Sequence, residues 1–464
     1  MAPFVEHFAS LPDPRVVGRS DHKLLDIIAI AILGTICGAE GWDDFAVLGE
    51  CKHRWLKTFL DLPAGIPSAD TFRRVLTALD PEAFGACFVA WMQALGGSPD
   101  GKLVAIDGKT ARRSFYRAAK RSPLHLVGAW VHQNNLTLGQ VATDPDSNEI
   151  TAIPTLLGML DLRGATVTID AIGTQKEIAQ VIVNRGADYL LALKANQTKL
   201  YEQVAHVFSE AGTGFFSLVK HTVHETAEEG HGRREGRRVW TTTDLSRIAE
   251  ASKWPGLRSI TMVERERQVG PDDEVTSERH YFISSSARAG ARTMGSLIRA
   301  HWSIENRCHW VLDVAFREDE SRIRAGQQNI GLLRKIALDL LKQDQTTKRG
   351  IAAKRKKAGW DHDYLLRVLS GTIPPDQTRP PWPAPSASWH VMAHSSLPSP
   401  ALAALRGPEQ AVRGPRALVG DPMERHARHV RLAGRCPRAL EAASARLVAL
   451  TANLVVLEID RISV

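Results

Sequence analysis

Apolar positions in the first 97 residues recur at three- and four-residue spacing, which is the period of an amphipathic helix. Capping residues divide the stretch into a helix over residues 23–37 and helices that begin at Asp43, Ser68 and Asp80, the last with Pro81 at its first position. We therefore predict an all-helical N-terminal domain, residues 1–97. Its exposed arginines and lysines suit DNA binding, and they equally suit a solvated packing domain, so both interpretations stay open.

From Lys102 onward the apolar pattern becomes that of a sheet with helices. Short β-branched runs predict strands over residues 103–107, 125–132, 136–141, 165–170 and 189–193. Helical spacing at residues 151–160 and 176–184 separates the last three strands. Three strands, a helix, a strand, a helix and a strand is the element order of the ribonuclease-H-like fold. We predict an α/β protein with a ribonuclease-H-like catalytic core, whose first part spans residues 98–204.

Two acids end strands of this core, and a third lies far along the chain. Asp107 closes the run Leu-Val-Ala-Ile-Asp, and Asp170 closes Ala-Thr-Val-Thr-Ile-Asp. Glu305 lies among Trp, Ile and Cys, in a segment whose apolar residues over positions 297–309 predict one amphipathic helix. A carboxylate on an apolar stripe needs a partner, because burying it alone is costly. We predict that the three acids meet and hold divalent metal, since carboxylate oxygens suit Mg²⁺.

The segment between the second and third acids, residues 205–292, has strand-like runs separated by charged turns. These runs cover residues 216–226, 237–243, 257–263 and 279–284. We interpret the segment as a β-rich insertion, after which residues 293–370 return to the core as helices that carry the third acid. A basic cluster within it consists of Arg233, Arg234, Arg237 and Arg238. We interpret this cluster as a strand edge that grips DNA phosphate; an edge strand kept soluble by charge is the alternative.

Several side chains near the acids compete with them or assist them. His301, Glu305 and His309 recur every four residues and would suit a metal such as zinc. Zinc favours closed sets of cysteine and histidine, so we instead expect the histidines to orient Glu305 or to contact DNA phosphate, His301 in particular. Asp313 is a rival third acid that we rank below Glu305.

Three polar residues at strand ends are expected to face DNA. Lys109 follows Asp107 by two positions and is predicted to contact phosphate. Lys194 and Asn196 end the last strand of the core and are predicted to line the same site.

Composition narrows the class of protein only slightly. The 464 residues suffice for two or three domains, and 44% hydrophobic with 24% charged residues is ordinary for a soluble globular protein. The net charge of +8 favours a polyanionic partner. The five cysteines form no C-x-x-C pair, so we expect reduced thiols in a cytosolic protein. We expect no leader segment and no membrane partner, because the longest apolar run is shorter than the ~20 residues of a membrane span.

The last part of the chain, residues 371–464, differs from the rest in composition. Proline, alanine and arginine abound there, and no lysine occurs after Lys357. Two interpretations stay open. The tail is translated in a shifted reading frame of a GC-rich gene, or it is a genuine, poorly ordered extension of the protein.

The chain has a family resemblance that runs from about residue 7 to residue 370, and seven motifs within this range carry it. They are His7-Phe-Ala-Ser-Leu-Pro-Asp-Pro-Arg15, Ala105-Ile-Asp-Gly-Lys-Thr110, Ser147-Asn-Glu-Ile-Thr-Ala-Ile-Pro154, Thr168-Ile-Asp-Ala171, Ala192-Leu-Lys194 with Asn196-Gln197, His231-Gly-Arg233 and His301-Trp-Ser-Ile-Glu-Asn306. With them the chain resembles the DDE transposases of bacterial insertion sequences, in particular the ISAs-type group that includes the H-repeat-associated proteins. Related transposases often carry a tyrosine and an arginine before the glutamate and a lysine after it. Here those positions are Ile298, His301 and Leu312, so these roles are not carried over.

The resemblance implies a ribonuclease-H-like core in which Asp107, Asp170 and Glu305 are the catalytic and metal-binding triad. It implies two Mg²⁺ ions, with Mn²⁺ as a substitute, and an endonuclease and strand-transfer activity that moves DNA by transposition. The expected partner is double-stranded DNA, both the terminal inverted repeats of the element and the target, bound by a homodimer in the bacterial cytoplasm and associated with the nucleoid. A catalytically inactive DNA-binding remnant of a transposase is the alternative.

Overall fold

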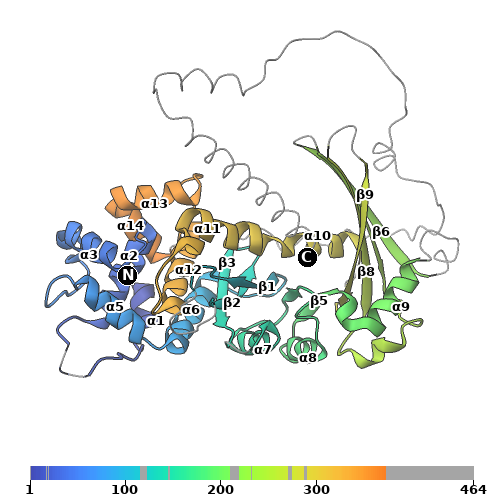
Figure 1. Cartoon of the computed structure of the whole chain (residues 1–464), viewed down its shortest axis with the longest axis horizontal. Helices are drawn as coiled ribbons and strands as arrows, with labels where there is room; N and C mark the ends of the chain where they lie inside the picture. The colour runs from blue at the N-terminus through green and yellow to red at the C-terminus, as the bar shows by residue number, and fades with distance from the viewer. Residues whose placement is uncertain are drawn as a thin grey trace, which may run out of the picture. The chain divides into compact units, whose positions relative to one another are not determined.

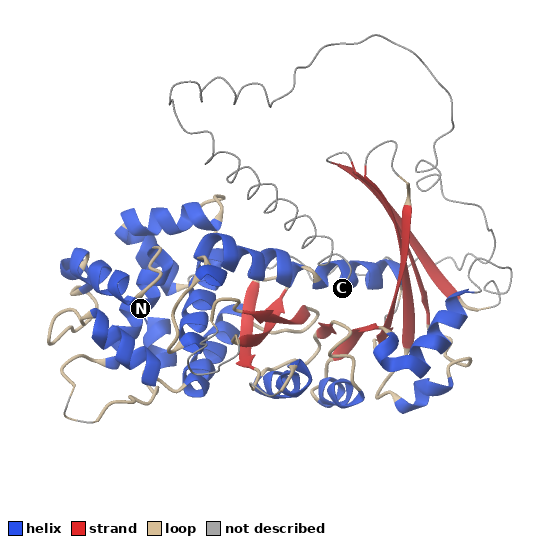
Figure 2. Ribbon diagram, viewed as in Figure 1, coloured by secondary structure: helices blue, strands red, loops and turns tan. Residues whose placement is uncertain are grey.

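The computed structural model describes residues 2–371, apart from residues 17, 19, 115–122, 145, 146, 210–218, 231, 232, 270–273 and 287–289. The described residues all belong to one compact unit. They form a mixed α/β structure with one large sheet (Figures 1 and 2), which confirms the predicted α/β class. Apart from Gly371, the predicted tail lies outside the described residues.

The chain begins with helices, as the apolar spacing predicts. They are α1 (Ala2–Phe8), α2 (Leu24–Cys37), α3 (Trp42–Cys51), α4 (His53–Leu56), α5 (Ala69–Ala78) and α6 (Pro81–Gly96). The side chains of Ser68 and Asp80 cap α5 and α6, each accepting a hydrogen bond from a backbone N–H of the first turn. The expected start at Asp43 is wrong. Gly41 is the N-cap of α3, and the carboxylate of Asp44 accepts hydrogen bonds from the N–H groups of Glu40 and Gly41.

A nine-stranded sheet forms the centre of the fold, in the order β3-β2-β1-β4-β5-β9-β8-β7-β6. The strands are β1 (Leu103–Thr110), β2 (His125–Val131), β3 (Leu136–Ala142), β4 (Thr166–Ile169), β5 (Asp188–Leu193), β6 (His221–Gly230), β7 (Arg233–Thr242), β8 (Ser259–Val269) and β9 (Thr276–Ser284). Strands β1, β4 and β5 are parallel, and the other neighbours are antiparallel. Ile106 pairs with Ile169, so the acids that follow these residues, Asp107 and Asp170, lie at the same edge of the parallel strands.

The strands predicted for the β-rich insertion continue this sheet. Leu191 of β5 pairs with Ile283 of β9, and β8, β7 and β6 follow in antiparallel order. The near halves of β8 and β9 carry buried residues such as Ile260, Met262 and Ile283, which belong to the hydrophobic core. Their far halves are half-buried or exposed and carry the charged residues, so the long hairpins extend beyond the core.

Helices cover both faces of the sheet (Figure 1). Helices α7 (Glu149–Met159) and α8 (Lys176–Asn184) lie on one face, and α10 (Ala291–His301) and α11 (Trp310–Phe316) lie on the other. The amide oxygen of Asn148 caps α7 by accepting a hydrogen bond from Ile150 N–H. Helix α9 (Thr198–Ser209) contacts β9.

Helix α12 (Gln327–Gln343) is buried along its length and contacts α2, α6 and β3, so it joins the N-terminal helices to the sheet. Among its buried polar residues, Asp339 accepts a hydrogen bond from Thr137 N–H at 3.2 Å, and Asn329 donates hydrogen bonds to Leu76 O and Leu79 O. Helices α13 (Ile351–Trp360) and α14 (His362–Ser370) complete the described chain. No single helix in the described ranges has the length and apolar composition to cross a membrane, although two bent pairs, α2 with α3 and α5 with α6, meet both criteria together.

Candidate active site

Asp107 lies on β1, where the strand passes from fully buried to half-buried residues. Its side chain is 27% exposed. Burial and, in decreasing order, the carboxylates of Asp170, Glu149 and Glu305 together raise the pKa of this carboxyl to about 8. Four acids from separate elements therefore share one neighbourhood, and Asp107 is at its centre.

Glu305 begins a π-helical turn, Glu305–His309, between α10 and α11. The predicted single helix over residues 297–309 is therefore wrong, because the π turn adds a residue and shifts the faces that follow. Cys308 and His309 are buried, whereas Trp302, expected on the apolar stripe, is 56% exposed. Trp310 is 59% exposed as well, so two indole rings flank the Glu305 turn at the surface.

His309 connects Glu305 to Asp107. Its imidazole is buried, and its Nδ1 lies 3.1 Å from Glu305 Oε2 and 3.4 Å from Asp107 Oδ2. Burial lowers the pKa of His309, so the ring is neutral and donates a single N–H at this nitrogen. The hydrogen bond from His309 lowers the pKa of Glu305 and keeps this acid ionised. The expectation that a histidine orients Glu305 agrees with this geometry.

Asp170 follows β4 at the start of a tight turn. Its Oδ1 accepts hydrogen bonds from Ile172 N–H at 3.1 Å and Gly173 N–H at 3.3 Å, which fixes the carboxylate against its own loop. Burial raises its pKa. Asn196 donates a hydrogen bond to Ala171 O at 2.7 Å and so holds the same loop from the end of β5.

The residues that the fold brings together suit a divalent cation. Ligand atoms of Asp107, Glu305 and His309 all lie within 4.8 Å of one another. Two carboxylates supply the hard oxygens that Mg²⁺ prefers, and a cation would offset the crowded negative charge that raises the pKa of Asp107. Asp170 is not a member of this close group within the described residues, although its charge acts on Asp107.

The surroundings of His301 differ from those expected of a residue that contacts DNA or binds zinc. Its Nδ1 lies 2.9 Å from Thr168 Oγ1, so it ties the end of α10 to the strand that precedes Asp170. Burial lowers the pKa of His301 to about 4, and the ring is neutral. It does not join Glu305 and His309 in a metal-ligating group among the described residues, which leaves the three-residue zinc set without a structural basis.

Lys109 points to the same face of β1 as Asp107 and is held by acids. Its Nζ lies 2.5 Å from Asp313 Oδ1 and 3.8 Å from Glu318 Oε2, and it donates a hydrogen bond to His309 O. Asp313, the rival third acid, is thus the ion-pair partner of this lysine.

Glu149, the first residue of α7, is an acid near the site to which the sequence analysis gave no role. Its Oε1 lies 2.7 Å from His125 Nε2, and His125 Nδ1 lies 2.7 Å from Thr110 Oγ1. A Cβ added at Gly108 would lie 2.1 Å from Glu149 Oε1, so the acid rests directly against the backbone beside Asp107. The glycine after the strand acid was the one sequence signal that could have revealed this close approach.

The basic cluster of β7 does not lie at a sheet edge, as both interpretations had assumed. Strand β7 lies between β8 and β6, and it carries glutamates on and beside it that pair with the arginines. Arg233 and Arg237 pair with Glu235, Arg234 with Glu229 at 3.3 Å, and Arg238 with Glu225 at 2.6 Å. Lys194, by contrast, is exposed, and its charge lowers the pKa of Asp170. His231 and Gly232 of the sequence motif lie outside the described residues.

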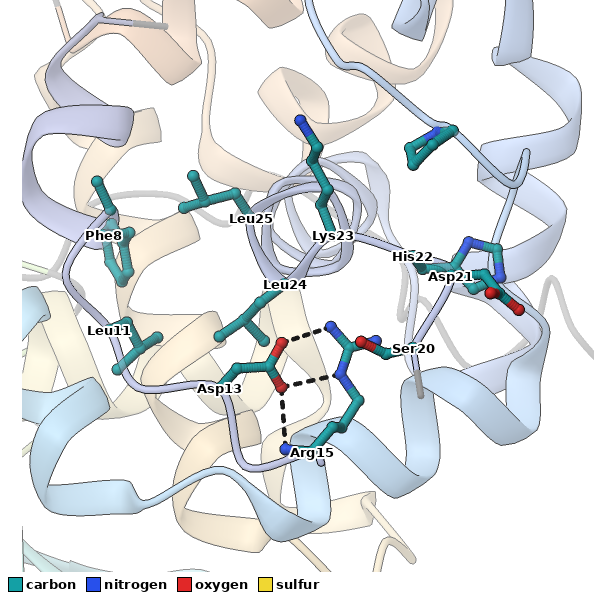
Figure 3. Close-up of a pocket in the computed structure, with 12 residues that line it drawn as sticks. Phe8, Leu11, Asp13, Arg15, Ser20, Asp21, His22, Lys23, Leu24 and Leu25 are labelled. Atoms are coloured by element: carbon teal, nitrogen blue, oxygen red, sulfur yellow. Dashed lines mark hydrogen bonds and ion pairs between the residues drawn. The ribbon is translucent and has the colours of Figure 1, made fainter. Parts of the chain in front are cut away.

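A cavity of about 490 Å³ lies in the N-terminal helical region, at the motif that begins with His7 (Figure 3). Asp13 and Arg15 face each other in it. The carboxylate accepts hydrogen bonds from Arg15 N–H, Nε–H and Nη2–H at 3.0, 2.9 and 2.7 Å. Because two side-chain donors of this arginine and its backbone N–H bind the same carboxylate, the motif stabilises its own loop, and Asp13 compensates the charge of Arg15.

Comparisons with known proteins identify the family of the chain. Residues 5–92 match the family described as DDE_Tnp_1-associated, and residues 98–340 match the family described as Transposase DDE domain. The chain is 40% identical over 370 residues to "Putative transposase YncI" of Escherichia coli O157:H7, covering 79% of this chain and 94% of that one. It is 37% identical over 373 residues to "H repeat-associated putative transposase YhhI" of Escherichia coli strain K12, covering 79% and 98%. The chain belongs to the DDE transposase family, as its motifs predict.

A solved structure of the piggyBac transposase synaptic complex with hairpin DNA also aligns, over 81% of this chain and 79% of that one. Its TM-score is 0.36 with 9% sequence identity.

Proposed function

We propose that the chain is an active transposase that cleaves DNA at the ends of its element and transfers the strands into target DNA. The observation that carries the proposal is the meeting of Asp107 on β1 and Glu305 of the π turn, far apart in sequence, on the two sides of one buried histidine. Asp170 completes the set from the neighbouring parallel strand. The catalytic and metal-binding residues are Asp107, Asp170 and Glu305.

The core is proposed to be ribonuclease-H-like. Support comes from the strand order β3-β2-β1-β4-β5. In it β3, β2 and β1 are antiparallel neighbours, and β4 and β5 run parallel to β1. In this proposal residues 98–204 form the first part of the core, residues 205–292 the insertion and residues 293–370 the returning helices, preceded by the helical domain of residues 1–97. The hairpin strands share the ladder of the core, so this insertion is an extension of the sheet.

Asp107 and Glu305 would hold divalent metal, with Asp170 beside them. When bound, two Mg²⁺ ions, for which Mn²⁺ is a substitute, supply the charge that activates water and stabilises the leaving oxygen of a phosphodiester. His309 holds Glu305 in position and, being neutral, adds no charge to the site. The half-buried position of Asp107 excludes part of the solvent, which strengthens each charge interaction there.

DNA is the proposed partner, as inverted-repeat ends and as target, held by a homodimer in the bacterial cytoplasm at the nucleoid. Lys194 and Asn196 are proposed to face DNA at the end of β5, where Lys194 is exposed. Lys109 can reach phosphate only by exchanging one of its two acid partners. A role of Arg233, Arg234, Arg237 and Arg238 in DNA binding likewise requires phosphate to compete with glutamate. His301 is proposed to act on DNA only indirectly, through the position of α10.

The test is a supercoiled plasmid that carries two copies of the element's terminal repeat, incubated with the full chain and Mg²⁺. We expect nicking and joined products, abolished by Asp107→Asn and by Glu305→Gln while DNA binding persists. Binding of the plasmid ends without nicking by the unaltered chain would instead support the inactive DNA-binding remnant. Cleavage that never yields joined products would identify a nuclease.

A further inference from the structure

Arg334 of α12 carries a buried positive charge that its neighbours compensate only in part. The residue is 8% exposed. Within the described part of the chain its guanidinium makes no hydrogen bond, and its one ion-pair partner, Glu318 Oε1, lies 3.9 Å from Nη1. A buried guanidinium without hydrogen-bond acceptors is costly, so a further acceptor is expected at this position.

The space in front of Arg334 is a cavity of about 350 Å³ with mostly charged walls. Its lining residues are Glu40, Arg113, Phe316, Arg317, Glu320, Ser321, Arg322 and Arg334. Four guanidinium groups face two carboxylates there, so the walls carry a net positive charge. Arg113 and Arg322 are exposed, and neither side chain has an ion-pair partner among the described residues. The planar guanidinium group of arginine can donate two parallel hydrogen bonds to the oxygens of one phosphate, so these walls suit a phosphate group.

Arg317 occupies a backbone conformation that favours glycine. Its φ is +52°, in the left-handed region, directly after the last residue of α11. Glycine is the usual residue at this position of a helix end, because a side chain is strained there. The side chain lines the cavity, where its guanidinium pairs with the carboxylates of Glu320 and, at 3.4 Å, Glu40. A phosphate therefore contacts Arg317 by replacing one of these two acids, as at Lys109.

The cavity lies next to the candidate active site. The Glu318 carboxylate is the link, with Oε2 at 3.8 Å from Lys109 Nζ and Oε1 at 3.9 Å from Arg334 Nη1. Lys109 in turn donates a hydrogen bond to the backbone oxygen of His309. A DNA strand that crosses the acids therefore passes close to the cavity and can place a neighbouring phosphate in it.

We propose that the cavity lined by Arg113, Arg317, Arg322 and Arg334 binds a backbone phosphate of the DNA strand whose cleavage takes place at Asp107 and Glu305. This inference rests on the proposed function, because it takes DNA as the ligand. The buried Arg334 supplies the fixed charge at the base of the cavity, and the other three arginines close around the phosphate from its rim.

The experiment measures binding of the full chain to a duplex with the element's own terminal repeat, in EDTA, over a series of salt concentrations. Each phosphate contact contributes about 0.9 to the slope of log K against log salt. We expect Arg317→Gly to fold at least as stably as the unaltered chain, because glycine relieves the left-handed strain, and to reduce the slope by up to about 0.9. Arg334→Gln is expected to reduce it likewise. The matched control is Arg163→Gln, which removes one charge from an exposed side chain that precedes β4, at the end of that strand opposite Asp170.

A second measurement places the contact on the DNA. Single phosphates of the duplex are replaced by neutral methylphosphonates. One position near the cleavage point is expected to weaken binding of the unaltered chain several-fold and to leave binding of Arg317→Gly unchanged. A folded Arg317→Gly chain with the slope and the methylphosphonate profile of the unaltered protein would overturn the phosphate site alone. Failure of the unaltered chain to bind the duplex at all would overturn the proposed function together with it.

Discussion

Replacing Gly108 by alanine tests how the strand that carries Asp107 rests on the acid behind it. The added Cβ would lie 2.1 Å from Glu149 Oε1 and 2.6 Å from His125 Nε2. Both atoms are the tips of side chains, so they can move aside, but their 2.7 Å hydrogen bond is then lost or distorted. Losing this bond and overpacking the site cost roughly 1–3 kcal/mol together. Alanine returns about 0.4–1 kcal/mol by restricting the unfolded chain, so we expect a net loss of up to about 2.6 kcal/mol.

The assay is urea unfolding followed by tryptophan fluorescence, in which a lower midpoint with an unchanged m value reports lost stability. The same substitution is then made in a chain that already carries His125→Ala and Glu149→Ala. There the obstruction is gone, and Gly108→Ala is expected to be neutral or slightly stabilising. Gly230→Ala, at an open position on β6, is the matched control and is expected to cost nothing. Equal destabilisation by Gly108→Ala in both backgrounds would refute the reasoning.

Three further outcomes are expected. Burial holds the pKa of His301 at about 4, below the ordinary 6.5, so on lowering the pH this histidine is protonated in the unfolded chain before it is protonated in the folded one. The free energy of unfolding should therefore fall as the pH drops from 6.5 toward 4, by up to about 1.4 kcal/mol per pH unit. Urea unfolding at each pH measures this slope, which is expected to be smaller in His301→Gln. Lys109→Met should cost about 3–5 kcal/mol in unfolding free energy, because Asp313 and the buried Glu318 lose their cation; a loss below about 1 kcal/mol would contradict the pairing. Trp310→Ala should leave the melting temperature nearly unchanged and weaken DNA binding about tenfold in a fluorescence-anisotropy titration, since an exposed indole beside Glu305 can stack on a base. An unchanged affinity for DNA would exclude this stacking.

Much of the fold follows from the apolar pattern. Helix α8 has the predicted bounds, because helical spacing and the glycine at position 186 define it locally. The parallel placement of Asp107 and Asp170 follows from strand order alone. Their catalytic roles remain predictions.

Other features depend on tertiary pairing and were not accessible from local spacing. Neither the end of α10 at Trp302 nor the π turn that starts at Glu305 leaves a mark in a three- and four-residue period, so Trp302 was placed on the wrong face. The partner of β5 cannot be identified from its own residues, so the union of the hairpins with the central sheet was not anticipated. Glu149 sits where an acid ordinarily begins a helix, and its contact with the Gly108 backbone depends on the packing of α7 against β2 and β3, the strands next to β1.

Helix α10 touches β1 and β4 at one end of its span and β6, β7 and β8 at the other. A Cβ on its Gly295 would come within 3.0 Å of Val239 on β7, so helix and hairpin are in close contact there, while His301 fastens the far end to Thr168. The helix therefore connects the hairpins to the turn that begins with Glu305. If the proposed function holds, a ligand that tilts the hairpins is expected to shift Glu305 relative to Asp107 and so to change the cleavage rate from a distance.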